Sequence, residues 1–124
     1  VISDPILYFS EARIQIPKLS QVGFTLESEQ YDFCFSPHYE EYNFTQVERG
    51  TTIGWRYNHQ LELLVNNNDS HDVGSRYFEY INNEIRLKQD IVPAMFTKDS
   101  AVIYQDCLGY IMKKIPLSSF KLPI

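Results

Sequence analysis

The stretch YFEYINNEIRLK, residues 77–88, decides the fold class of this chain. Its two halves are rich in aromatic and β-branched residues, which favour strands, and they are joined by Asn82-Asn83. Asparagine tolerates a positive φ, so this pair suits the two-residue type I′ turn of a β-hairpin. The residues that would then face each other are Tyr80 with Ile85, Phe78 with Leu87, and Glu79 with Arg86. Apolar side chains meet on one face and opposite charges on the other, so the stretch predicts an antiparallel hairpin.

Working outward, the same pairing test predicts two further hairpins. Residues 22–26 and 31–35 place apolar opposite apolar across a turn at 27–30. Residues 101–105 can return as 110–115, with Gly109 supplying a left-handed turn residue.

The longest alternation of apolar and polar residues runs from 53 to 65 and predicts a strand. A turn at Arg49-Gly50 would pair it with residues 40–48, placing Glu40 opposite His59. The competing interpretation of that partner is a short helix after Ser36-Pro37, with Ser as N-cap and Pro at the first helical position. Asp4-Pro5 is a similar start signal and predicts a helix over 5–12, followed by a strand over 13–16.

Composition agrees with a β-rich fold, because the chain contains nine tyrosines, eight phenylalanines and many β-branched residues, while alanine stands only at positions 12, 94 and 101. Its 124 residues suffice for a single globular domain spanning 1–124. We therefore expect a mainly-β fold, an antiparallel sandwich or barrel of about eight strands with one or two short helices. The alternative is an α+β fold with an antiparallel sheet.

The charge balance bears on partners. Eleven Lys and Arg against sixteen Asp and Glu give a net charge of −5, which argues against binding nucleic acid. The acidic residues gather in two clusters that could face a basic protein: Glu27, Glu29 and Asp32, then Glu40, Glu41 and Glu48. No apolar run approaches the roughly 20 residues of a membrane span. A removed signal peptide is one explanation for a first residue other than Met, and it would make the protein secreted or extracytoplasmic.

Metal and cofactor sites are not expected. Cys34 and Cys107 lack zinc-site spacing, and the sequence leaves open whether they pair or remain free thiols. The polar loop 66–72 fails the calcium-loop pattern, since His71 stands where that loop requires glycine. The glycines are scattered rather than clustered in a phosphate-binding turn, so no nucleotide cofactor is expected.

The residues that could carry chemistry are few. His59 on an otherwise apolar strand face, oriented by Glu40, is the candidate catalytic pair of a small hydrolase or isomerase. For binding, exposed aromatic, amide and carboxylate groups are the chemistry of a recognition surface. The candidate binding residues are Trp55, Tyr57, Tyr42, Asn67, Asp69, His71 and Asp72.

The leading expectation is a non-enzymatic protein-interaction domain, either an assembly subunit or an acidic inhibitor or immunity-type partner of a basic protein. It depends on the acidic clusters, on the many tyrosines and on the failure of every catalytic pattern. One alternative is a carbohydrate- or small-ligand-binding module that uses Trp55, Tyr57 or the Asn-rich loop. The other is the hydrolase or isomerase with the His59–Glu40 pair.

Overall fold

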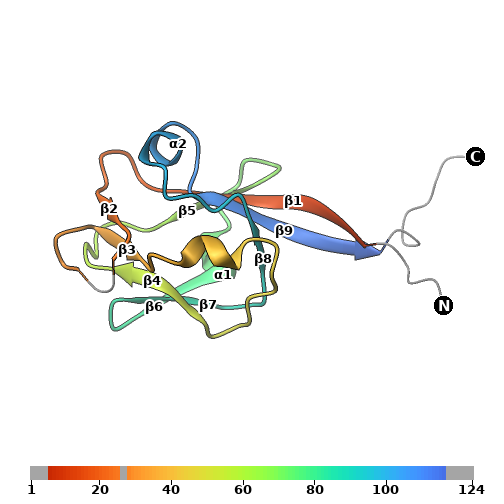
Figure 1. Ribbon diagram of the computed structural model, residues 1–124, viewed down its shortest axis with the longest axis horizontal. Coiled ribbons are helices and arrows are strands. Elements are labelled where there is room, and N and C mark those ends of the chain that lie inside the picture. The colour runs from red at the N-terminus through yellow and green to blue at the C-terminus, as the bar shows by residue number, and fades with distance from the viewer. Residues whose placement is uncertain (1–5, 26–27, 117–124) are drawn as a thin grey trace, which may run out of the picture.

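The structure is a computed structural model that describes residues 6–25 and 28–116. Within these residues nine strands, two short α-helices and one 3-10 helix are present (Figure 1). The strands are β1 (Ile6–Gln15), β2 (Val22–Gly23), β3 (Phe33–Phe35), β4 (Thr52–Arg56), β5 (Leu64–Asn67), β6 (Phe78–Ile81), β7 (Glu84–Leu87), β8 (Val92–Ala94) and β9 (Gly109–Pro116). The helices are η1 (Tyr39–Tyr42), α1 (Gly74–Tyr77) and α2 (Ser100–Gln105). The predicted mainly-β class is confirmed.

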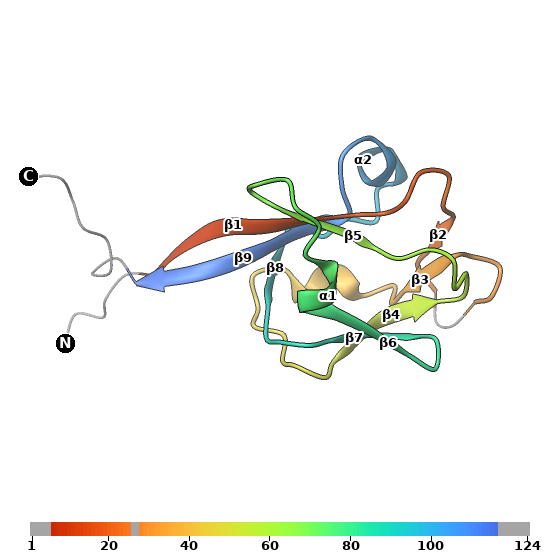
Figure 2. The same ribbon diagram turned by 180° about the vertical axis from the view of Figure 1, so that it is seen from behind.

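The strands form two sheets that do not close into a barrel within the described residues. One sheet has the order β5-β1-β9-β8 and the other the order β2-β3-β4-β7-β6. All pairings between named strands are antiparallel except β2 with β3. In both views β1 and β9 lie side by side and extend away from the rest of the molecule (Figures 1 and 2).

The hairpin at residues 77–88 is confirmed in the predicted register. Phe78 pairs with Leu87, Glu79 with Arg86 and Tyr80 with Ile85. Asn82 and Asn83 have φ values of 49° and 70°, as a type I′ turn requires. Tyr77 belongs to α1 rather than to the strand, although its carbonyl accepts a hydrogen bond from the Lys88 N–H and so continues the ladder (2.8 Å).

The predicted antiparallel hairpin of 22–26 with 31–35 is wrong, because β2 runs parallel to β3. Its Leu26 lies outside the described residues. The Asp32 carboxylate accepts hydrogen bonds from the Gln21 N–H (2.8 Å) and the Asn58 side chain (3.1 Å), which fixes the chain just before β3 beside the start of β2. Two separate contacts of an aspartate therefore override the local apolar pairing.

The predicted strand over 53–65 is divided between two sheets. β4 ends at Arg56, and β5 begins at Leu64 in the other sheet. Asn58 turns the chain between them, since its side-chain oxygen accepts from the Gln60 N–H (3.1 Å) and its carbonyl from the Leu61 N–H (3.1 Å). The alternation of apolar and polar residues in the sequence runs across this turn because the segment on each side of it buries one face.

The predicted strand over 40–48 is also wrong, and a short helix is observed instead, although it begins at Tyr39 with His38 as N-cap rather than at Pro37 with Ser36 as N-cap. The Ser36 carbonyl accepts from the Tyr39 N–H (3.1 Å), and the 3-10 helix η1 follows. Glu40 therefore does not stand opposite His59 in a strand pair.

Two further predictions fail at the ends of the chain. The described part of 5–12, predicted as a helix, is strand, because β1 pairs with β9 along its length and with β5 at its C-terminal end. The segment 101–105, predicted as a strand, is helix α2, because the Asp99 side chain caps it by accepting from the Ala101 N–H (2.9 Å). β9 pairs with β1 and β8 instead, and Gly109 is its first residue rather than a left-handed turn residue.

An aromatic stack fills the core between the sheets. The Tyr39 ring lies 5.1 Å from Phe24, 5.7 Å from Phe35 and 5.1 Å from Phe96, measured between ring centroids. Its hydroxyl donates to the Thr97 carbonyl, and burial raises its pKa far above the usual value. Cys34 and Cys107 are both buried as free thiols. The stack joins η1 to the segment after β8, and these two segments build the surface described next.

Candidate functional site

Phe44 and Met95 are large apolar residues that the fold leaves in solvent. Phe44 is 61% exposed and Met95 is 66% exposed, although burial of such side chains is favourable by roughly 1.5–3 kcal/mol each. Both also have a left-handed backbone, with φ values of 61° and 58°. That conformation costs a residue with a Cβ about 1–2 kcal/mol. Each residue thus destabilises the isolated fold twice, through its exposed side chain and through its backbone conformation.

The backbones of Phe44 and Met95 belong to two segments that are hydrogen-bonded to each other. The Asn43 side chain accepts from the Phe96 N–H (2.8 Å) and donates to the Phe96 carbonyl (3.0 Å). The Phe44 N–H donates to the Pro93 carbonyl (2.7 Å). Because Phe96 also stacks on Tyr39, the pair is held by the core behind it.

The other non-glycine residues with positive φ in the described chain either lie in turns or have no second such residue hydrogen-bonded to their segment. Asn82, Asn83 and Ser70 lie in turns, where short polar side chains tolerate this conformation. Leu19, which is 96% exposed, is in the loop between β1 and β2. Only Phe44 and Met95 are brought together by hydrogen bonds between their segments.

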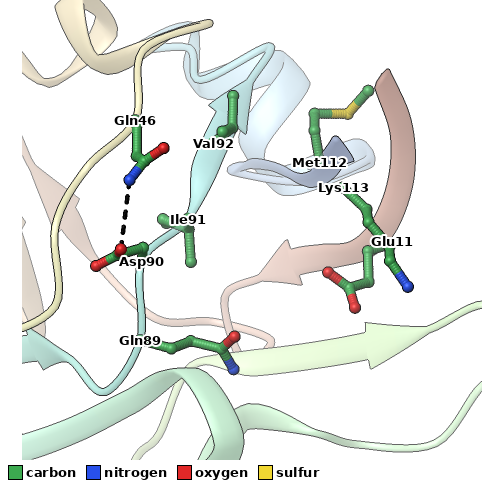
Figure 3. Close-up of a pocket in the computed structure, with 8 residues that line it drawn as sticks. All are labelled: Glu11, Gln46, Gln89, Asp90, Ile91, Val92, Met112 and Lys113. Atoms are coloured by element: carbon green, nitrogen blue, oxygen red, sulfur yellow. Dashed lines mark hydrogen bonds between the residues drawn. The ribbon is translucent and has the colours of Figure 1, made fainter. Parts of the chain in front are cut away.

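A groove of about 370 Å³ lies near this pair, where residues 89–92 face Glu11, Met112 and Lys113 (Figure 3). Val47 and Ile91 form a bridge and the Phe44 N–H donates to the Pro93 carbonyl, so the segment that follows Phe44 runs beside residues 91–93. Gln46, on this segment, donates to the Asp90 carboxylate (3.3 Å) on the same side of the groove. The residues that line it are Glu11, Gln46, Gln89, Asp90, Ile91, Val92, Met112 and Lys113. We call Phe44, Met95 and this groove the β8 edge surface.

Glu11 reaches the groove because it is the extra residue of a bulge in β1, where the register shifts between Ser10 and Ala12. Burial, the charge of Glu11 and a hydrogen bond to Glu11 raise the pKa of Tyr77 to about 12. Tyr77 therefore keeps its proton at neutral pH, and its hydroxyl hydrogen-bonds to Glu11 at the edge of the groove.

Exposed carboxylates flank the β8 edge surface. Glu40 and Glu41 precede Phe44 in η1, and Glu48 follows it, all three exposed. Asp90 is held in place by the Arg49 N–H (2.7 Å). The cations nearby are Lys113 in the groove, Arg49, and Lys98, whose backbone N–H donates to Glu40 (3.2 Å). With Glu11 in the groove, the surface has five carboxylates against these three cations, so it is predominantly acidic.

The structure places His59 and Glu40 with different partners. His59 Nε2 lies 2.6 Å from the Asn83 side-chain oxygen, whereas Glu40 accepts from the Lys98 N–H. Metal-site geometry is likewise missing, since no group of three or more His, Cys, Asp or Glu in the described ranges could hold a metal ion.

The other candidate binding residues fall in three places. Trp55 and Tyr57 line one depression, together with the turn at Asn82-Asn83. Tyr42 is half-buried and packs against the core. One turn contains Asn67, Asp69, His71 and Asp72. Backbone N–H groups of this turn are hydrogen-bonded within it, since the Asn67 side chain accepts from the N–H groups of Asp69 and His71, at 3.0 Å each.

Sequence reasoning missed Phe44 and Met95. Neither is of a residue type that favours positive φ, and the hydrogen bonds that impose it come from residues about fifty positions away, as between Asn43 and Phe96. The neighbouring acidic cluster, Glu40, Glu41 and Glu48, and the candidate binding residue Tyr42 were the sequence features that pointed to this region.

Comparison with protein-family models, curated proteins and solved structures found no match for this chain. None of the helices in the described residues is both long and apolar enough to cross a bilayer.

Proposed function

We propose that this chain is a protein-interaction domain that docks a partner protein on the β8 edge surface. One observation carries the proposal: Phe44 and Met95 are held in a left-handed backbone and are 61% and 66% exposed, on two segments that hydrogen bonds join to each other. Strain of this kind is retained where the surroundings over-determine it, and it concentrates at functional positions. A partner that buries both side chains would recover the free energy that their exposure costs.

The chemistry of the surface favours a protein partner. Phe and Met are enriched at protein interfaces, and the unbranched Met side chain adapts to an apolar partner surface. The groove adds buried apolar side chains, Ile91 and Val92, beside the polar groups of Gln46 and Asp90.

The flanking charge favours a basic partner segment. Glu40, Glu41 and Glu48 are exposed around Phe44 and would complement Lys or Arg on the partner. An assembly subunit and an acidic inhibitor or immunity-type protein would both use such a surface, and the identity of the captured partner distinguishes them.

A photo-crosslinking experiment tests the proposal. The phenylalanine analogue p-benzoylphenylalanine at position 44 is expected to give one discrete heterologous product in the cells from which the chain derives. Mass spectrometry identifies the partner, and its affinity for the purified chain is then measured. Because the proposed rim is ionic, the affinity should fall as salt is raised.

Leu64 provides the matched control position, because it is an exposed apolar residue at 40% on the edge strand β5, away from β8. The same analogue at position 64 is expected to give no such product, and Met95→Ser is expected to remove the product formed at position 44. Equal products at both positions, or a self-crosslink at twice the chain mass alone, would overturn the proposal.

A further inference from the structure

A second depression lies on the outer face of the five-stranded sheet, apart from the β8 edge surface. It measures about 440 Å³ and is lined by Glu29, Trp55, Tyr57, Asn82, Asn83 and Glu84. An adjoining depression of about 460 Å³ shares Glu29 and Tyr57 and adds Tyr31, Asp32, Asn58 and His59, with Gln30 and Gln60. The two form one continuous surface.

Two aromatic side chains line this surface. Trp55 belongs to β4, Tyr57 follows the last residue of that strand, and both line the same depression. Across the sheet, Trp55 has Cys34 on one side and Glu84 on the other, neither of which is large enough to cover an indole ring. Both aromatic side chains are half-buried, which leaves part of each ring accessible.

Two asparagines line the surface beside these aromatic residues. The contact of 2.6 Å between His59 Nε2 and the Asn83 side-chain oxygen holds the Asn83 amide. The type I′ turn places Asn82 next to it, exposed at the tip. Amides that both donate and accept are suited to hydroxyl groups, which do the same.

The charges of the surface select against anionic ligands. No Lys or Arg lines either depression, so an anion finds no counter-charge. Asp32 already accepts from the Gln21 N–H and the Asn58 side chain, and Glu84 from Thr52 (2.8 Å) and Arg86 (2.5 Å). The hydrogen bonds from Arg86 and Thr52 hold the pKa of Glu84 below its usual value. Arg86 therefore offsets the charge of Glu84, and the Asp32 oxygens are already occupied by donors from the protein, so two of the three carboxylates have less capacity to bind a further ligand.

From this lining we propose that the Trp55–Tyr57 face binds a neutral oligosaccharide. The apolar face of a sugar ring would stack on Trp55, and its hydroxyl groups would bond to Asn82, Asn83 and Glu29. Such a site would work independently of protein docking on the β8 edge surface, because the two surfaces share no lining residue.

Trp55 is the only tryptophan of the chain, so intrinsic fluorescence reports directly on this site. The test titrates the protein with maltohexaose, cellohexaose, xylohexaose, mannohexaose and chitohexaose, each to about 10 mM. At least one is expected to change Trp55 emission along a saturable curve that is unaffected by added salt. Oligogalacturonate, which is anionic, is expected to leave the emission unchanged.

Variants separate binding from folding. Tyr57→Ala and Asn83→Gly are expected to weaken the binding about tenfold each, and glycine at position 83 keeps the left-handed turn. The control Tyr104→Ala removes a 52% exposed tyrosine on α2 and should leave the affinity unchanged. Circular dichroism confirms that each variant is folded.

Three outcomes would overturn the inference: no response to any of the neutral sugars, equal losses in Tyr57→Ala and Tyr104→Ala, or a response to hexalysine alone that salt abolishes. Sugar binding should persist when Phe44 and Met95 are replaced, so failure of this inference and failure of the proposed protein docking are distinguishable.

Discussion

Replacing Tyr39 with alanine is expected to lower the free energy of unfolding by about 3–5 kcal/mol, which is the range for removing a large aromatic side chain from a core. Tyr39 is only 2% exposed. Its ring stacks on Phe24 and Phe96, so its loss opens a cavity where η1 meets the segment after β8. Urea unfolding followed by circular dichroism measures the change.

Tyr39→Phe is the matched variant, because it keeps the ring and removes only the hydroxyl that donates to the Thr97 carbonyl. It is expected to cost about 1–2 kcal/mol. If both variants cost the same, the hydroxyl rather than the stacked ring would hold these segments together.

Alkaline pH gives a second readout of the same site. Burial raises the pKa of Tyr39 in the folded state, so folding favours the neutral hydroxyl. This contribution is complete below the unfolded pKa of about 10 and is lost as pH rises through the folded value. Tyr39→Phe should therefore lose less stability than the unmodified chain above about pH 10.

Gly109→Ala is expected to cost about 2–3 kcal/mol through overpacking. A Cβ at this position would lie 2.1 Å from Phe96 Cδ1. The Phe96 ring has little room to withdraw, because it is buried and its centroid lies 5.1 Å from that of Tyr39. Thermal and urea unfolding measure the loss.

The glycine of α1 is the control for this prediction. A Cβ at Gly74 would meet the flexible Asp72 carboxylate at 3.2 Å, so Gly74→Ala should change stability little. Combining Gly109→Ala with Phe96→Leu should recover part of the loss, since the smaller side chain makes room. Strictly additive losses would mean that the methyl group and the ring do not collide.

Local chemistry explains how much of the fold the sequence predicts. The 77–88 hairpin is specified by its own turn residues, Asn82-Asn83, and by matched faces, so it forms in the predicted register. The hairpin predicted at 101–115 fails because β9 pairs with β1, whose residues lie at the other end of the chain. The antiparallel pairing predicted for β2 and β3 fails for a related reason, since Asp32 fixes the direction of the two strands through contacts outside both of them.

The candidate sites also differ in whether nearby or distant parts of the sequence specify them. Trp55, Tyr57 and His59 are close in sequence, and the structure gathers them on one continuous surface. Phe44 and Met95 were not predictable, because their left-handed backbone depends on the hydrogen bonds between Asn43 and Phe96. Exposure imposed by long-range contacts leaves no periodic pattern in a sequence.

The most direct test of protein docking on the β8 edge surface is a paired measurement on the variant Phe44→Asn/Met95→Asn. Asparagine tolerates positive φ, so the free energy of unfolding should rise by about 1 kcal/mol relative to the unmodified chain. With the photo-crosslinker at Gln46 in the groove, the heterologous product should be lost in the same variant. Docking at this surface predicts greater stability together with lost capture. Lower stability together with undiminished capture would contradict it.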